Sequence, residues 1–169
     1  MQTNALPRFD ASDNPTGCCP RFNPDGWDGI TLHLRNLPML RATTRSLAHV
    51  PLNMGRVMTR VLTRGEAAGT FHPEHRLVLS RDLSAFAAEH LFAVSGPVEG
   101  EEMVTLSGDF ASRCFEGPYR QAGQWCAEMR ALARECGHEP GRVFLFYTTC
   151  PRCARTYGRN PVVGFVELA

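Results

Sequence analysis

The chain has 169 residues, which is the size of one ordinary domain with enough interior for a hydrophobic core. Its formal net charge of +1 argues against a nucleic-acid partner, because nucleic-acid-binding domains concentrate a much larger positive excess. The chain contains no lysine, which excludes Schiff-base and lysine general-base chemistry.

Cysteine usage and apolar runs predict where the protein resides. The seven cysteines are an odd number, and the polar first stretch lacks the apolar core of a secretory signal. A reducing cytoplasm is expected, where paired thiols bind metal more often than each other. No apolar run approaches the roughly 20 residues of a membrane span. We therefore expect a cytoplasmic protein with no membrane partner.

The chain begins with a polar segment and an arm. Residues 1–17 are rich in Asn, Asp and Pro and have little to bury, which predicts a disordered tail. Residues 18–29 form a cysteine-bearing arm that includes Trp27, and we expect it to lie across the body of the domain. Residues 30–169 are expected to form a single domain with halves at about 30–98 and 103–169.

The first half has the pattern strand, helix, strand, strand. A strand is predicted around 39–48, and a helix that Gly69 ends follows Pro51. Further strands are predicted at 76–80 and 89–95. The apolar residues that recur at helical spacing are Met54, Val57, Met58, Val61 and Leu62.

The second half repeats this order. A strand around 110–115 leads into Glu116-Gly117-Pro118-Tyr119, and a helix that Gly137 closes comes next. Strands are predicted at 143–148 and 162–168. The apolar positions of this helix are Ala122, Trp125, Cys126, Met129 and Leu132.

The predicted fold class is α+β. The two strand–helix–strand–strand units are interpreted as a duplication that forms one antiparallel sheet with two helices on one face. A concave groove between such halves is a natural ligand cavity.

Four cysteines occur as two tight pairs, Cys18-Cys19 and Cys150-Pro-Arg-Cys153. Thiolates are soft donors, and short cysteine spacings joined across a long stretch are typical of tetrahedral zinc sites. The pattern predicts that Cys18, Cys19, Cys150 and Cys153 hold one zinc ion and so join the first segment of the chain to the last.

Several alternatives remain open at this cysteine site. Adjacent cysteines are uncommon as joint ligands, so His33, Asp28 or a water could replace Cys18 or Cys19. A redox dithiol at the C-P-R-C turn, or separate unligated thiols, would also fit the spacing. The other three cysteines, Cys114, Cys126 and Cys136, are predicted to pack as small hydrophobes.

Glu116 is the candidate catalytic residue. It lies between a predicted strand and a Gly-Pro helix start, where apolar groove neighbours would raise its pKa and suit it to proton transfer. Alternatively it is a helix-entry carboxylate that the helix dipole favours. The candidate ligand-binding residues are Tyr119, Tyr147 and Trp27, since aromatic surface stacks flat ligands and attracts cations.

The run from Ser107 to Gly137, followed by VFLFYTTCPRCARTYG, resembles the GyrI-like small-molecule-binding fold, which is related to the ligand domains of multidrug-responsive regulators and to the SOUL haem-binding family. The turn from Phe115 to Tyr119 is its best local marker. The segments TGCCPRFNPDGWD, HVPLNMG, FEGPY and YTTCPRCARTYG together resemble an uncharacterised bacterial group, labelled only "hydrolase", that adds paired cysteines to this fold.

The resemblance implies a groove for an aromatic, hydrophobic or reactive small molecule. Some branches of the GyrI-like group hydrolyse strained electrophiles with a pocket carboxylate. Relatives commonly carry a glutamate just before the strand tyrosine, whereas Phe146 precedes Tyr147 here. Glu116 is the nearest replacement in this chain.

The function predicted is therefore a zinc-stapled small-molecule-binding protein of GyrI-like type, and a hydrolase if Glu116 acts on the bound compound. One alternative is a module that sequesters a ligand without turnover. Another is a thiol- or metal-responsive sensor. The sequence does not decide between an enzyme and a binding protein.

Overall fold

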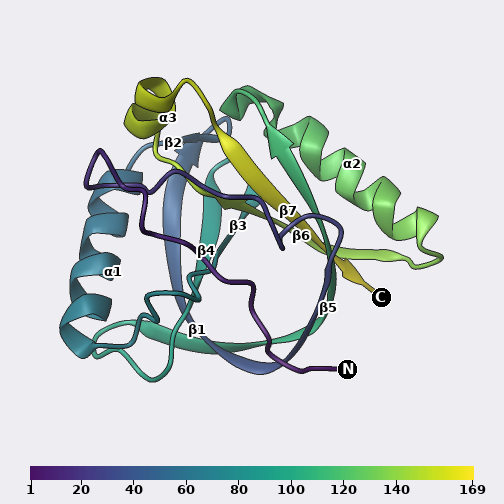
Figure 1. The fold of residues 1–169 in the computed structure, drawn as a ribbon, viewed down its shortest axis with the longest axis horizontal. Helices are drawn as coiled ribbons and strands as arrows, with labels where there is room; N and C mark the ends of the chain where they lie inside the picture. Colours follow the sequence, from purple (N-terminus) through teal and green to yellow (C-terminus); the bar gives the residue numbers. More distant parts are fainter. The chain divides into compact units, whose positions relative to one another are not determined.

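The computed structural model describes residues 1–169 as an α+β protein with three α-helices and antiparallel strand pairs (Figure 1). Backbone proximity divides the chain into two compact units. The cysteine unit comprises residues 1–35, 73–75 and 107–169, and the hairpin unit comprises residues 36–72 and 76–106. The α+β class expected from the sequence is confirmed.

The hairpin unit contains a small antiparallel sheet. Its strands are β1 (Thr31–Leu47), which enters the unit at Asn36, β2 (Val50–Pro51), β3 (Val78–Ser84) and β4 (Ala87–Ala93). Strand β4 pairs with both β1 and β3, so that Phe92 is opposite Leu40 on one side and Val78 on the other.

Helix α1 (Met54–Ala68) covers one face of this sheet (Figure 1). Val57 and Val61 are buried and pack in one cluster with Leu40 and Phe92. The helix ends at Gly69, whose φ of 66° is a left-handed conformation that glycine adopts without steric cost. The helix and its stop are therefore confirmed.

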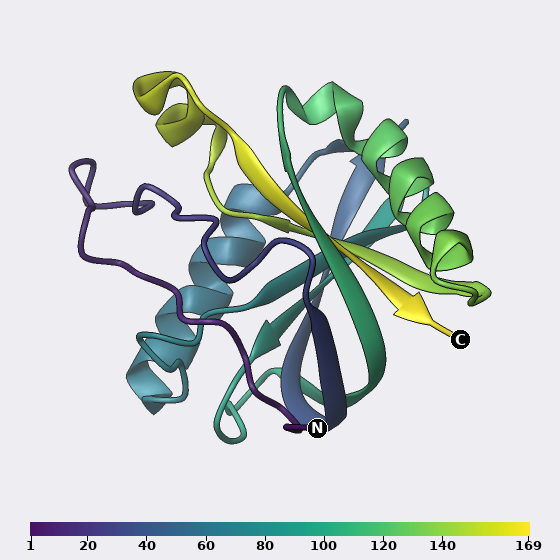
Figure 2. The ribbon, with the colours of Figure 1, turned by 45° about the vertical axis from the view of Figure 1, so that its right-hand side comes forward.

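The cysteine unit contains the second sheet. Its strands are β5 (Glu102–Glu116), which enters the unit at Ser107, β6 (Pro140–Tyr147) and β7 (Pro161–Leu168), and β7 pairs antiparallel with both of the others. A short 3-10 turn, η1 (Tyr119–Gln121), leads into α2 (Ala122–Glu135). Figure 2 shows α2 running beside these strands.

Helix α2 buries Trp125, Met129 and Ala133 against this sheet. The helix approaches β7 closely at Gly164, where an added Cβ would lie 2.8 Å from the sulfur of Met129 and 2.8 Å from the ring of Phe115. Glycine is thus required at this position for helix and strand to pack at this distance.

An aromatic cluster joins the N-terminal segment to β6. The ring centroids of Phe9, Phe22 and Trp27 each lie within 6.3 Å of the ring centroid of Phe146. Phe9 is a buried member of the segment expected to be a disordered tail, and Trp27 has no exposed surface. Aromatic side chains therefore pack the arm, and Phe9 before it, against β6.

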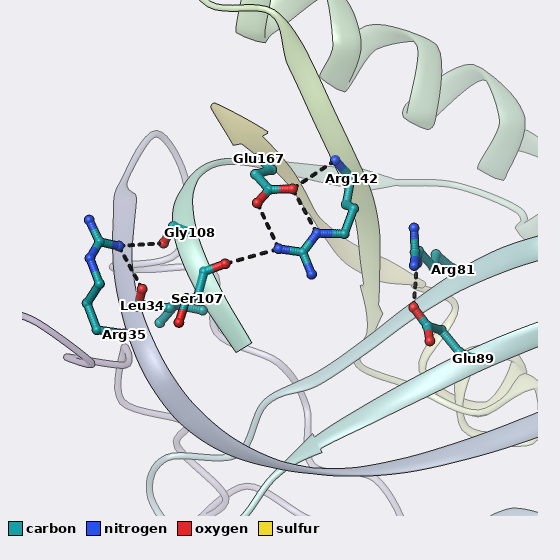
Figure 3. Close-up of polar contacts among 8 residues, drawn as sticks. All are labelled: Leu34, Arg35, Arg81, Glu89, Ser107, Gly108, Arg142 and Glu167. Atoms are coloured by element: carbon teal, nitrogen blue, oxygen red, sulfur yellow. Dashed lines mark hydrogen bonds and ion pairs between the residues drawn. The ribbon is translucent and has the colours of Figure 1, made fainter. Parts of the chain in front are cut away.

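Ion pairs join strands within each unit (Figure 3). In the cysteine unit, the guanidinium of Arg142 binds both carboxylate oxygens of Glu167, each at 2.7 Å, and donates to the carbonyl of Ser107. In the hairpin unit, the buried carboxylate of Glu89 accepts from both Arg41 and Arg81.

The structure corrects two sequence predictions about elements. The strands expected around 39–48 and 110–115 are much longer, since β1 begins at Thr31 and β5 at Glu102. The segment after β6 that carries Cys150 was expected to be a loop, and it is a third helix, α3 (Pro151–Tyr157). None of the three helices is both long enough and apolar enough to cross a bilayer.

Candidate metal centre

Helix α3 positions the C-terminal cysteine pair. Cys150 is the N-cap with extended backbone (φ −75°, ψ 164°), and Pro151 occupies the first helical turn, where its fixed φ suits a helix start. The Sγ of Cys150 accepts a hydrogen bond from the backbone N–H of Cys153 at 3.5 Å. The Cys-Pro-Arg-Cys spacing therefore turns both sulfurs toward the same side of the helix start.

The other pair reaches this point from the arm. The four Sγ atoms of Cys18, Cys19, Cys150 and Cys153 all lie within 4.8 Å of one another. The sulfurs of the adjacent pair, Cys18 and Cys19, are 3.7 Å apart, so the two side chains point the same way despite being neighbours in sequence.

This geometry fits a tetrahedral thiolate site. With zinc–sulfur bonds of about 2.3 Å, the sulfurs of such a site lie about 3.8 Å apart. The Cys18–Cys19 separation already has this value, and the widest pair needs to close by roughly 1 Å. Zinc accepts four soft thiolates in this arrangement, so the residues present fit the ion.

Thr16 and Tyr157 hold the site from outside. The hydroxyl of Thr16 lies 3.3 Å from the Sγ of Cys153 and 3.0 Å from the hydroxyl of Tyr157. Tyr157 donates to the carbonyl of Cys19, and the N–H of Cys150 donates to the Sγ of Cys19 at 3.3 Å. These bonds connect α3 to the arm and orient the sulfurs, as outer hydrogen bonds do around metal ligands.

The protonation preferences of the metal-free thiols differ. The hydrogen bond from Thr16 is the main cause that lowers the pKa of Cys153 to about 6, while burial raises the pKa of Cys18 and Cys19. Cys153 is fully buried and Cys18 is exposed. The site thus has one thiolate ready at neutral pH and one ligand open to solvent.

The residues considered as replacement ligands lie elsewhere. His33 contacts the carboxylate of Asp109 at 3.0 Å, and Asp28 accepts from the backbone N–H of Cys114 at 2.7 Å. Neither belongs to the group of four sulfurs. All seven cysteines are free thiols, so the C-P-R-C pair is not a disulfide.

The three remaining cysteines are not alike. Cys114 and Cys126 are half-buried, and burial together with the charge of Asp28 raises the pKa of Cys114 to about 11. Cys136 is exposed, so the prediction that it packs as a small hydrophobe is wrong. It caps the end of α2, where the backbone continues to the turn at Gly137 and the side chain faces solvent.

Glu116 is held by an arginine. Both of its carboxylate oxygens accept from the guanidinium of Arg159, at 2.7 and 3.0 Å. This bond lowers the pKa of Glu116, whereas the sequence analysis expected apolar neighbours to raise it. The correction follows from Arg159, which lies just after α3 and is brought to the end of β5 by the pairing of Glu116 with Pro161.

An open cavity of about 430 Å³ surrounds this ion pair. It is bordered by the turn after β5 and by the side of α3 that carries Ala154 and Arg155. The complete lining is Glu116, Gly117, Pro118, Tyr119, Pro151, Ala154, Arg155, Gly158, Arg159 and Asn160. Glu116 and Tyr119 therefore share one cavity, and α3 borders both this cavity and the cysteine cluster.

Of the three aromatic candidates, Tyr119 alone lines this cavity. Tyr119 lines the cavity and donates its hydroxyl to the carbonyl of Thr149 at 2.6 Å, and its ring lies 5.7 Å from that of Tyr147. Tyr147 does not line the cavity, and Trp27 is buried in the aromatic cluster with its indole N–H bound to the carbonyl of Arg8.

Sequence reasoning missed Thr16, Tyr157 and Arg159. Thr16 lies two residues before Cys18, and Tyr157 lies four residues after Cys153, on the same face of α3. Polar residues at such distances from paired cysteines are a weak signal, because many arrangements of the arm are compatible with the sequence.

A comparison with protein-family models shows which family the chain belongs to. A model described as "Bacterial hydrolase" matches residues 9–168, nearly the whole chain. The chain belongs to the bacterial hydrolase family. The matched residues include the four clustered cysteines, Glu116 and Arg159. No curated protein matches the chain.

Proposed function

We propose that this member of the bacterial hydrolase family is a zinc-stapled protein that binds and hydrolyses a small molecule. The proposed zinc site rests on one observation: the four sulfurs of residues 18–19 and 150–153 lie within 4.8 Å of one another. The family assignment supports hydrolysis. A duplicated GyrI-like arrangement, and a cytoplasmic location where the thiols stay reduced, belong to the same proposal.

The proposed role of the zinc ion is structural. Four thiolates complete a tetrahedral zinc site and leave no position for a water or substrate. Cys18 and Cys19 would tie the arm, and Cys150 and Cys153 would tie the start of α3. A helix of seven residues is too short to be stable alone, so the ion would also keep α3 in place.

The proposed small-molecule site is the cavity around Glu116. Pro118, Tyr119 and Pro151 supply apolar surface, and Arg155 and Arg159 supply positive charge. Such a mixture of flat apolar surface and a few polar groups is typical of small-molecule sites. A hydrophobic or aromatic compound with a reactive, electron-poor atom would fit this lining.

In the proposed step, Glu116 acts as a general base. Arg159 keeps its carboxylate ionised at neutral pH, so it can take a proton from a water molecule as the water oxygen attacks the electrophilic atom. The bond from that atom to its leaving oxygen breaks, and the leaving oxygen is protonated from solvent. A carboxylate held by arginine is a weak base, so the reaction requires a strained or otherwise activated substrate.

The bidentate pair with Arg159 also favours a second function, ligand binding without turnover. A carboxylate that is fully engaged by a guanidinium is a common structural element. In this alternative, Glu116 and Arg159 shape the cavity and the bound compound leaves unchanged.

Glu116→Gln separates the two functions. The substitution keeps the shape of the side chain and removes the base, so hydrolysis of strained electrophiles such as epoxides should fall at least about 100-fold while compound binding persists. Glu135→Gln on the exposed end of α2 is the matched control. Unchanged hydrolysis in Glu116→Gln would rule out this carboxylate as the base.

A further inference from the structure

Exposed apolar side chains gather at one end of the hairpin unit. Seven large hydrophobic residues of the protein are exposed, and five of them belong to two neighbouring turns, with 45–66% of each residue exposed. We call these five the apolar tip: Leu47, Val50, Leu52, Leu83 and Phe86. A contiguous apolar patch on a surface marks an interaction site more often than scattered exposed residues do.

Backbone hydrogen bonds hold the two turns side by side. The N–H of Ser46 donates to the carbonyl of Phe86 at 2.8 Å, and the N–H of His49 donates to the carbonyl of Ala85 at 2.9 Å. The ring of His49 lies 2.7 Å from the carboxylate of Asp82. The β1–β2 turn is thereby fixed to the β3–β4 turn, so the backbone that carries the five apolar residues is held together at one end of the unit.

The β1–β2 turn also adopts an unfavourable conformation. Ala48 and His49 have φ values of 48° and 68°, a left-handed region that residues other than glycine rarely adopt in succession. Positive φ at both central residues is the geometry of a two-residue type I′ hairpin turn. Leu47 and Val50 are directly opposite each other across this turn, so their side chains lie on the same face of the hairpin.

The rim of the apolar tip is positively charged. Arg45 in β1 and Arg56 in α1 form no ion pair in the structure, and both are exposed. The acidic residue of the two turns is Asp82, whose carboxylate lies 2.7 Å from the ring of His49. A partner that covers this surface must therefore bring negative charge around an apolar centre.

We propose that the apolar tip docks onto the surface of an anionic lipid bilayer. Strand β2 has only two residues and ends at Pro51, which has no N–H to donate, so it offers little backbone for an added peptide strand. On an anionic bilayer, the apolar side chains would enter the membrane interface and the flanking arginines would contact acidic headgroups. This partner therefore matches both the apolar tip and its positively charged rim.

A second copy of this chain fits the surface less well. The tip offers on the order of 500 Å² of apolar area, below the about 800 Å² per partner of a standard stable interface. Two copies facing each other would also bring Arg45 and Arg56 of both copies together. The sequence predicts no membrane partner because it has no spanning run, but a protein that lies on a bilayer needs no span.

The test is co-sedimentation of the zinc-loaded full chain with vesicles. Vesicles of 30% phosphatidylglycerol in phosphatidylcholine should bind the protein, and pure phosphatidylcholine vesicles should bind it far more weakly. Phe86→Ser should weaken partitioning at least about tenfold by removing apolar area. Arg45→Gln and Arg56→Gln should each weaken it about fivefold at low salt and have little effect at high salt.

Leu62→Ser is the matched control, because Leu62 is an exposed leucine of α1 outside the tip. It should bind vesicles like the unaltered protein, and circular dichroism should show that each variant is folded. Absence of binding to anionic vesicles would overturn the proposal. So would binding that Phe86→Ser leaves unchanged, or a dimer in sedimentation velocity that Phe86→Ser dissociates, since that result assigns the tip to a second copy.

Discussion

Cys18 and Cys153 carry the same side chain in opposite surroundings. Cys153 is a buried residue of α3 with its sulfur 3.3 Å from the hydroxyl of Thr16, whereas Cys18 is exposed at the bend of the arm. In the proposed zinc site, the buried thiol would be positioned before the ion arrives, and the exposed thiol would complete the site. The residues around the sulfurs would therefore determine how tightly the ion is held.

Thr16→Val should weaken zinc binding about 10- to 100-fold. The substitution removes the hydroxyl that lies between Cys153 and Tyr157, and loss of such outer hydrogen bonds typically costs this much metal affinity. Competition with a chromogenic chelator measures the change. Thr156→Val, on the exposed side of α3, should leave the affinity unaltered; equal effects from both variants would mean that Thr16 has no special role.

His90 predicts a pH dependence in the hairpin unit. The ring is buried, with Thr44 2.9 Å from Nε2 and Ser80 2.7 Å from Nδ1. Burial lowers the pKa of His90 below 6.5, although the charges of Asp82 and Glu89 oppose the shift. The unfolded state therefore binds the proton more readily, and the stabilising contribution, complete above about pH 6.5, is lost as the pH falls through the folded-state value.

The free energy of unfolding should accordingly decrease between pH 7.5 and 5.5, and His90→Gln should flatten this decrease. Urea titrations followed by circular dichroism at several pH values measure both slopes. Glu89 also has a lowered pKa, but it titrates at lower pH and does not contribute in this window. Parallel slopes for the two proteins would contradict the assignment to His90.

At the scale of elements, α2 and β7 meet at Gly164. Gly164→Ala should destabilise the protein by about 1–3 kcal/mol, because the new methyl group would overlap Met129 and Phe115 in a packed interior. Gly123→Ala, on α2 with open space around the position, should stabilise by about 0.5–1 kcal/mol through helix propensity. Thermal melting compares the two; a neutral Gly164→Ala would show that the helix can move away from the strand.

Sequence patterns predicted α1 and α2 well because both are amphipathic and end near glycines. Gly69 and Gly137 each adopt a left-handed conformation just beyond their helix. Helix α3 was missed because seven residues are too few for a periodic pattern, and Cys-Pro at its start is equally typical of a turn. Tertiary contacts, and not local preference, define this element.

The long strands were underestimated for a different reason. Asn36, with a φ of 49°, and Pro38 interrupt the alternation of β1, and Gly108 interrupts β5. These residues read as strand boundaries in the sequence, but they lie close to the points where each strand passes from one unit to the other. Strands β1 and β5 nevertheless continue through these residues, because each strand pairs with segments that are distant in the sequence.

For the candidate site, spacing alone predicted the four cysteines that the fold brings together. It did not predict Arg159 as the partner of Glu116, because that contact depends on the register of β5 with β7. The cysteine cluster could be predicted because the pairs are recognisable from their spacing in the sequence. The charge environment of Glu116 could not, because it is created by folding.

At the scale of the whole molecule, zinc would join chain segments more than 130 residues apart. The aromatic cluster of Phe9, Phe22, Trp27 and Phe146 already packs the arm, and the ion would add its binding free energy to this packing. The cysteine unit would then contain both the zinc site and the cavity around Glu116, and α3 borders each of them.

The most direct test is elemental analysis of protein purified without added metal. The account predicts one zinc ion per chain, and its loss in a Cys150→Ser, Cys153→Ser variant, while a Cys114→Ser, Cys136→Ser control retains the ion. Protein that contains no metal, or zinc that remains when the C-P-R-C cysteines are replaced, would contradict the account.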